Sequence, residues 1–169
     1  TFEEPSRPGL FYHLVQTHTR PVFAVSLLET APKSINSATV IGLLPAPTED
    51  ELGTESDATL EDFKPNPVFR ELLFKSVKDG LARGVDDGLA TLAKTVRDGW
   101  LHVNDERNEA AKTGDRIGSP DDIVGSVCVK EGKIIPDTFE PMPSYRLCTP
   151  DGVVRLSDPL MAYLIERLK

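Results

Sequence analysis

The chain has little of what most recognisable sites are built from. Its 169 residues include two cysteines, three histidines and one tryptophan. It contains no GxxxxGK[ST] phosphate loop, GxGxxG fingerprint, HExxH, CxxC, GxSxG or EF-hand motif. Nucleotide-phosphate binding, structural zinc and α/β-hydrolase chemistry therefore lose their usual sequence support. The sequence predicts no cofactor and no metal ion.

Long apolar runs and an excess of positive charge are also missing. No stretch approaches the roughly 18 apolar residues of a transmembrane helix. Thr1 to Leu10 lacks the basic-then-apolar pattern of a signal peptide. The net charge of −8 argues against binding to duplex nucleic acid, which requires a concentrated basic surface. The expected partner is a protein or a small molecule, with no nucleic acid and no membrane. The oligomeric state is left open.

The two cysteines, Cys128 and Cys148, have a spacing that fits no zinc or redox motif. Two buried free thiols are favoured over a disulfide, which would require the two residues to lie in register on adjacent strands. The chain also has no Asn-x-Ser/Thr sequon. Both features favour an intracellular, cytoplasmic location, with organelle import of a processed chain as the alternative.

The stretch from Asn66 to Trp100 has the clearest helical pattern. Asn66 is a suitable N-cap and Pro67 suits the first helical position. Gly80, Gly84 and Gly88 lie four residues apart, so one long helix would carry a bare strip. Each interior glycine costs roughly 1 kcal/mol relative to alanine. We therefore expect two helices, over 67–82 and 85–98, with a break at Gly84. The apolar stripe of the first consists of Phe69, Leu73, Val77 and Leu81.

The remaining pattern is mostly β. Alternating or continuous apolar side chains predict strands over 10–17, 22–28, 38–44, 100–103, 123–130, 133–139, 145–149 and 153–156. A last helix follows, with Leu160, Leu164, Ile165 and Leu168 on its buried side. Because helices and strands are segregated, the predicted class is α+β. We expect a single domain with a mainly antiparallel sheet of six to eight strands and two or three helices packed on one face. The alternative is a partly closed β-barrel capped by the C-terminal helix.

Two polar stretches interrupt this pattern. Residues 48–62 contain seven acidic residues and no lysine or arginine, which predicts a flexible acidic loop. A solvated insertion is favoured there over an acidic docking segment. Residues 104–121 form a second long polar stretch, and loops of that length are often functional.

The densest group of reactive side chains lies where a predicted strand opens into the second loop. It consists of His102, Asp105, Glu106 and Arg107. A histidine beside carboxylates could act as a general base or take part in a metal site, and the competing interpretation is a half-buried strand histidine followed by a solvated charged turn. Two further candidates lie elsewhere. His13 is on the first strand, and Arg146 could bind an anion from a sheet face.

Two functional hypotheses follow. The first is a soluble intracellular binding or protein-interaction domain, supported by the missing catalytic motifs and the acidic composition. The alternative is a small enzyme or ligand-binding protein with a pocket around His102, Asp105 and Arg107. The sequence favours the first hypothesis, and therefore a protein that is not an enzyme. The two differ in whether these three side chains converge on a cavity.

Overall fold

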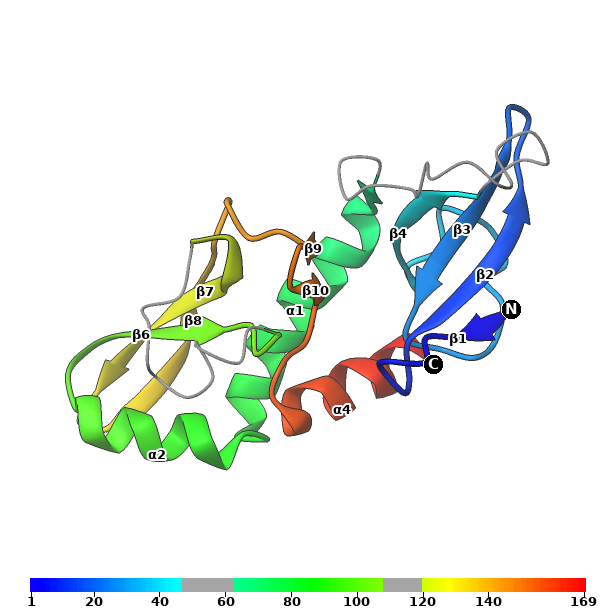
Figure 1. Ribbon diagram of the computed structural model, residues 1–169. Helices are drawn as coiled ribbons and strands as arrows, with labels where there is room; N and C mark the ends of the chain where they lie inside the picture. Colours follow the sequence, from blue (N-terminus) through cyan, green and yellow to red (C-terminus); the bar gives the residue numbers. More distant parts are fainter. Residues whose placement is uncertain (47–62, 108–119) are drawn as a thin grey trace. The chain divides into compact units, whose positions relative to one another are not determined.

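The computed structural model describes residues 1–46, 63–107 and 120–169, and its described part contains three α-helices and ten strands (Figure 1). Every strand pairing in it is antiparallel. The predicted α+β class is therefore confirmed. The predicted acidic loop at 48–62 and residues 108–119 of the second loop lie outside the described residues.

The described strands do not join into the single sheet of six to eight strands that we expected. They form separate sheets of five, three and two strands, and none of these sheets closes into a barrel. Along the chain, the helical stretch lies between the fifth and sixth strands, so the strands of the first sheet all precede it and those of the other two sheets all follow it. The chain also divides into two compact units, residues 1–72 with 168–169 and residues 73–167. A single domain stays a prediction.

The first unit contains the five-stranded sheet, which follows the order of the chain. The predicted strands at 10–17, 22–28 and 38–44 are confirmed, each to within about two residues. Short strands that we had not predicted flank them at both edges of the sheet. The five strands are β1 (Phe2–Glu3), β2 (Phe11–Gln16), β3 (Pro21–Ser26), β4 (Val40–Pro45) and β5 (Lys64–Pro65).

Helix α1 (Pro67–Arg83) begins at the predicted cap. The Oδ1 atom of Asn66 accepts a hydrogen bond from the backbone N–H of Val68 at 3.1 Å, which satisfies one of the first-turn amides. The side-chain amide of Asn66 donates to the carbonyls of Ser37 and Val40 at 2.9 and 2.8 Å. One asparagine therefore starts the helix and joins its first turn to strand β4.

The predicted break between the two helices is confirmed. Helix α1 ends at Arg83 because Gly84 adopts a φ of +66°, a conformation that favours glycine. Helix α2 (Asp87–Val96) then starts from Asp86, whose carboxylate accepts from the backbone N–H of Leu89 at 3.1 Å. The two helices are thus separate capped elements.

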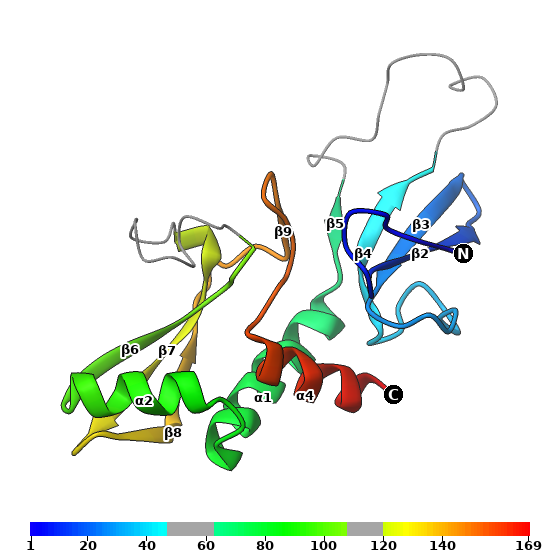
Figure 2. The same ribbon diagram turned by 60° about the horizontal axis from the view of Figure 1, so that its bottom comes forward.

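The second unit contains a three-stranded sheet in the order β6-β7-β8. Its strands are β6 (Gly99–Asn104), β7 (Ile123–Lys130) and β8 (Lys133–Pro141). Glu131 and Gly132 connect β7 to β8 with φ values of +51° and +76°, as a two-residue turn with two left-handed positions requires. Helix α2 lies along one face of this sheet (Figures 1 and 2).

Helix α4 (Asp158–Leu168) has the predicted apolar stripe, with Leu160, Leu164 and Leu168 buried and Ile165 half-buried. It packs on α1 at Gly80, where an added Cβ atom would lie 2.9 Å from Leu160 Cδ2. Among the described helices, none combines the length and the apolar character needed to cross a bilayer.

The predicted hairpin over 145–149 and 153–156 is much shorter in the structure. Strands β9 (Cys148–Thr149) and β10 (Gly152–Val153) have two residues each. A short 3₁₀ helix, η2 (Pro120–Asp122), precedes β7. These small elements of the second unit carry most of the polar network described below.

Candidate functional site

Strand β6 divides the predicted reactive group. Successive side chains of a strand point to opposite faces, and Leu101 and Val103 are buried with only 4% and 2% of their surface exposed. Trp100 and His102 are exposed on the other face. The Nδ1 atom of His102 lies 2.8 Å from the hydroxyl oxygen of Ser126 on β7. His102 is therefore a residue of the open side of the sheet.

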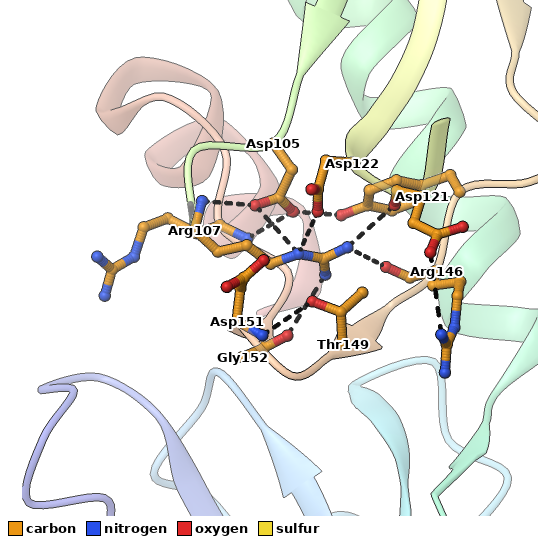
Figure 3. A network of polar contacts seen from close by, with 10 residues as sticks. Asp105, Arg107, Asp121, Asp122, Arg146, Thr149, Asp151 and Gly152 are labelled. Atoms are coloured by element: carbon orange, nitrogen blue, oxygen red, sulfur yellow. Dashed lines mark hydrogen bonds and ion pairs between the residues drawn. The ribbon is translucent and has the colours of Figure 1, made fainter. Parts of the chain in front are cut away.

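Asp105, directly after the strand, has the opposite environment, since none of its surface is exposed. Its Oδ1 atom accepts from the backbone N–H of Arg107 at 2.8 Å (Figure 3). Its Oδ2 atom accepts from the Tyr145 hydroxyl at 2.5 Å and from the Arg155 backbone N–H at 3.0 Å. Three donors thus surround one buried carboxylate.

The guanidinium of Arg107 is buried beside this carboxylate. Its Nε atom donates to Asp122 Oδ1 at 3.0 Å and lies 3.6 Å from Asp105 Oδ1. Its terminal nitrogens are directed at backbone carbonyls, as Figure 3 shows. The central carbon of the guanidinium, Cζ, lies 5.3 Å from the centre of the Tyr145 ring. These carbonyls belong to Asp121 at 3.0 Å, Arg146 at 2.7 Å and Gly152 at 3.5 Å.

The pKa values of the network follow from its burial. Burial raises the pKa of the Asp105 carboxyl, while the charge of Arg107 and the Tyr145 hydrogen bond oppose that rise. Burial and the neighbouring Asp105 raise the pKa of Tyr145 well above its usual value. The phenol therefore keeps its proton at neutral pH and acts as the donor to the carboxylate.

This network, which we call the Arg107 network, consists of Asp105, Arg107, Asp122 and Tyr145. Both carboxylate oxygens of Asp105 and all three guanidinium nitrogens of Arg107 are occupied by partners in the chain itself. A buried ionic group arranged in this way holds loops together. It joins the end of β6, helix η2 and the β9–β10 segment.

The other predicted site residues lie apart from one another. The backbone N–H of Glu106 donates to the Arg155 carbonyl at 2.7 Å, and its side chain is half-buried. Arg146 contributes its carbonyl to the Arg107 network, while its exposed guanidinium lies 3.9 Å from a carboxylate oxygen of Asp121. The structure therefore brings Asp105 and Arg107 together and places His102 on the other side of the sheet, and a role for these residues stays a prediction.

His13 belongs to the first unit and is buried, with 1% of its surface exposed. Its Nδ1 atom lies 2.9 Å from the Thr1 hydroxyl, and its Nε2 atom lies 2.9 Å from the Leu28 carbonyl. Both ring nitrogens are thus occupied within that unit. This geometry is typical of a core histidine that fixes chain segments.

Sequence reasoning missed two essential members of the Arg107 network, Asp122 and Tyr145. They lie 15 residues from Arg107 and 40 residues from Asp105, respectively. The available signal was the Asp121–Asp122 pair directly before the clearest β pattern of the chain, because acids at a strand entry need a partner when they are buried.

Both cysteines are free, with Cys148 buried and Cys128 half-buried. Burial raises the pKa of the Cys148 thiol. Within residues 1–46, 63–107 and 120–169, no group of three or more His, Cys, Asp or Glu side chains is arranged to hold a metal ion.

The surface on the outward side of β6-β7-β8 we call the open face. The strand register places Trp100 opposite Cys128 and His102 opposite Ser126, and Cys128 in turn opposite Ile135. Trp100 is 55% exposed, whereas Ser126, Cys128 and Ile135 are half-buried.

Two cavities in the second unit, of about 350 and 240 Å³, are lined by other residues. His102, Asp105 and Arg107 line neither. No protein-family model, no curated protein and no solved structure matches this chain.

Proposed function

We propose that this chain is a binding domain for another protein, and that the open face around Trp100 and His102 is its contact surface. The observation that carries the proposal is the exposure of Trp100 on this sheet face. Tryptophan is among the residues most enriched at the energetic centres of protein interfaces. It supplies a large apolar area together with one hydrogen-bond donor.

The surroundings of Trp100 favour a protein over a small molecule. Small-molecule sites enclose most of the ligand surface in a concave pocket. The open face is instead a sheet surface. On it, the polar pair of His102 and Ser126 lies next to the more apolar row of Trp100, Cys128 and Ile135. The net charge of −8 also disfavours nucleic acid as the partner.

The alternative of a small enzyme around His102, Asp105 and Arg107 has less support. His102 contacts Ser126 on the open face, whereas Asp105 and Arg107 are occupied with each other in the buried network. General acid–base catalysis requires the catalytic groups to reach one substrate atom. An exposed histidine and a saturated buried pair are poorly arranged for that.

Affinity capture from an extract of native cells tests the proposal. The immobilised chain is compared with Trp100→Gln and with Leu92→Gln as the matched control, since Leu92 on helix α2 is 46% exposed. We expect one or more proteins to be retained by the wild type and by Leu92→Gln and lost with Trp100→Gln. Equal retention by all three would contradict the proposal.

The fluorescence of Trp100 provides the second measurement. It is the only tryptophan in the chain, so its emission reports on the open face alone. Adding the purified partner should shift the emission to shorter wavelengths and protect it from acrylamide quenching. An unchanged emission with a partner that binds would place the contact surface elsewhere.

A further inference from the structure

Strand β6 forms one edge of the three-stranded sheet (Figure 2). It pairs with β7 from Gly99, opposite Val129, to Asn104, opposite Ile123. Among the described residues, no strand pairs with its other side. The backbone groups of an antiparallel strand alternate between its two sides. Every second residue of β6 therefore directs its N–H and C=O groups away from the sheet.

These outward groups have no hydrogen-bond partner in the described part of the chain. Within that part, β6 makes the ladder with β7 and the side-chain contact between His102 and Ser126, and no further hydrogen bond. A row of open donors and acceptors along a strand edge is a template for pairing with a further strand.

The opposite edge of the same sheet, strand β8, is protected against such pairing. Three charged residues, Lys133, Asp137 and Glu140, lie exposed along it. Pro136 interrupts it as well, because proline has no N–H to donate. Strand β6 has the sequence GWLHVN, with no proline and no Asp, Glu, Lys or Arg. Of the two edges of this sheet, only β6 has the features that favour addition of a strand.

We propose that two copies of the chain pair through their β6 strands, antiparallel to each other, so that their two three-stranded sheets become one continuous sheet. A twofold axis perpendicular to the sheet makes such a contact self-complementary, because each open donor of one copy meets an open acceptor of the other. Charge favours a second copy as the occupant. Each copy has a net charge of −8, and pairing along the uncharged β6 places no acidic side chains opposite each other.

Side-chain direction limits the register of this contact. Residues opposite each other in an antiparallel pair point to the same face, and Trp100 and His102 share the open face. Pairing along most of β6 then leaves two registers, with either Leu101 or His102 on the twofold axis. The two His102 side chains are diagonal neighbours in the first register and direct neighbours in the second. In both they lie within about 8 Å, which long side chains can span.

Analytical ultracentrifugation over a range of protein concentrations tests the proposal. We expect a monomer–dimer equilibrium. Added sodium chloride should shift it towards the dimer, because salt screens the repulsion between two copies with a charge of −8 each. A chain that stays monomeric up to millimolar concentration, in low and in high salt, would overturn the proposal.

Charges introduced at His102 locate the contact. His102→Glu and His102→Lys each place like charges next to one another across the axis, so each should weaken dimerisation by roughly fivefold or more. Both variants should fold, because His102 is exposed. An equimolar mixture of the two should recover the dimer, since Glu then faces Lys. Leu92→Glu and Leu92→Lys, at an exposed position of α2, are the matched controls and should dimerise like the wild type. Equal weakening by the controls, or no recovery in the mixture, would contradict the proposal.

Hydrogen exchange provides a second measurement, at the backbone. Every second amide over residues 99–104 should exchange more slowly at high than at low protein concentration, because the dimer protects the outward groups. A dimer in which these amides keep their exchange rates would overturn the proposal, since the contact would then lie elsewhere.

This inference and the proposed binding at the open face fail separately. A monomeric chain whose capture of a partner depends on Trp100 would overturn the paired β6 strands alone. A dimer with protected β6 amides, whose capture of partners is unchanged by Trp100→Gln, would overturn the proposed function alone.

Discussion

The open face and the Arg107 network begin on the same strand but differ in almost every physical respect. His102 is exposed and contacts the hydroxyl of Ser126 on the neighbouring strand. Asp105, three residues later, is fully buried and accepts three hydrogen bonds. The difference shows that reactive residue types close together in sequence need not form one site. Strand alternation directs the histidine outward, and the end of the strand turns the following residues inward.

The comparison predicts opposite responses to mutation, and the largest effect is expected at Arg107. Arg107→Met leaves the carboxylates of Asp105 and Asp122 buried without their cation. Removing one partner of a buried ion pair costs about 3–5 kcal/mol. Urea denaturation at neutral pH measures the loss. Arg146→Met is the matched control, because its exposed guanidinium is 3.9 Å from Asp121, and we expect a change within about 0.5 kcal/mol. Equal losses for the two variants would contradict the assignment.

The effect of Arg107→Met should also depend on pH. The pKa of Asp105 is raised in the folded chain, so the folded state holds this proton to a higher pH than the unfolded state. Stability from this group is present below the unfolded pKa and is lost as the pH rises through the folded pKa. The charge of Arg107 lowers the pKa of Asp105, so removing Arg107 raises the folded-state pKa further. The pH range over which protonated Asp105 stabilises the folded chain then extends to higher pH. Denaturation at neutral pH and near pH 5 should therefore show a smaller deficit of the variant at the acidic pH. A deficit that grows on acidification would contradict this account.

An apolar core position provides a scale for these losses. Leu164 of helix α4 is completely buried, and Leu164→Ala should cost about 2–5 kcal/mol. Unlike the loss at Arg107, this one should not depend on pH, because no charge is involved. The same urea titrations measure it, with Leu92→Ala as the exposed control. A loss near zero at Leu164 would show that α4 does not form part of the core.

Tyr145→Phe tests the network with the smallest possible change of shape. The variant removes one of the three donors to Asp105 and leaves the ring beside Arg107 in place. Loss of a partner from a buried polar group costs about 1–3 kcal/mol. The pKa of Asp105 should rise further, since the Tyr145 hydrogen bond lowers it. Thermal unfolding and an NMR titration of the Asp105 carboxyl measure the two effects. Unchanged stability would mean that the hydrogen bond contributes nothing net.

The smallest effect on stability is expected at the open face. His102→Ala removes an exposed side chain whose contact is to Ser126, so stability should change by less than about 0.5 kcal/mol. Binding of the captured partner should weaken, because His102 lies two residues from Trp100 on the same face. Calorimetric titration of that partner measures the second effect. A large loss of stability with unchanged binding would contradict the comparison, because His102 would then stabilise the fold and not contribute to binding at the open face.

The sequence was a good guide to local structure in this protein. Asn66 and Gly84 mark the beginning and end of the first helix because capping and left-handed glycine conformations depend on only a few neighbouring residues. The hairpin at Glu131 and Gly132 and the apolar stripe of the last helix follow from turn chemistry and periodicity in the same way. The exposure of His102 also follows from alternation along one strand.

Tertiary structure alone decided how these elements and side chains combine. The division of the strands into three sheets and the partners of Arg107 are long-range properties. Asp105 accepts hydrogen bonds from residues 40 and 50 positions away, and no local pattern encodes such a distance. A charged residue in a polar stretch has the same sequence signature whether it is solvated or buried with a partner. The free energy that separates these outcomes comes from desolvation and pairing, and both are set when the chain packs.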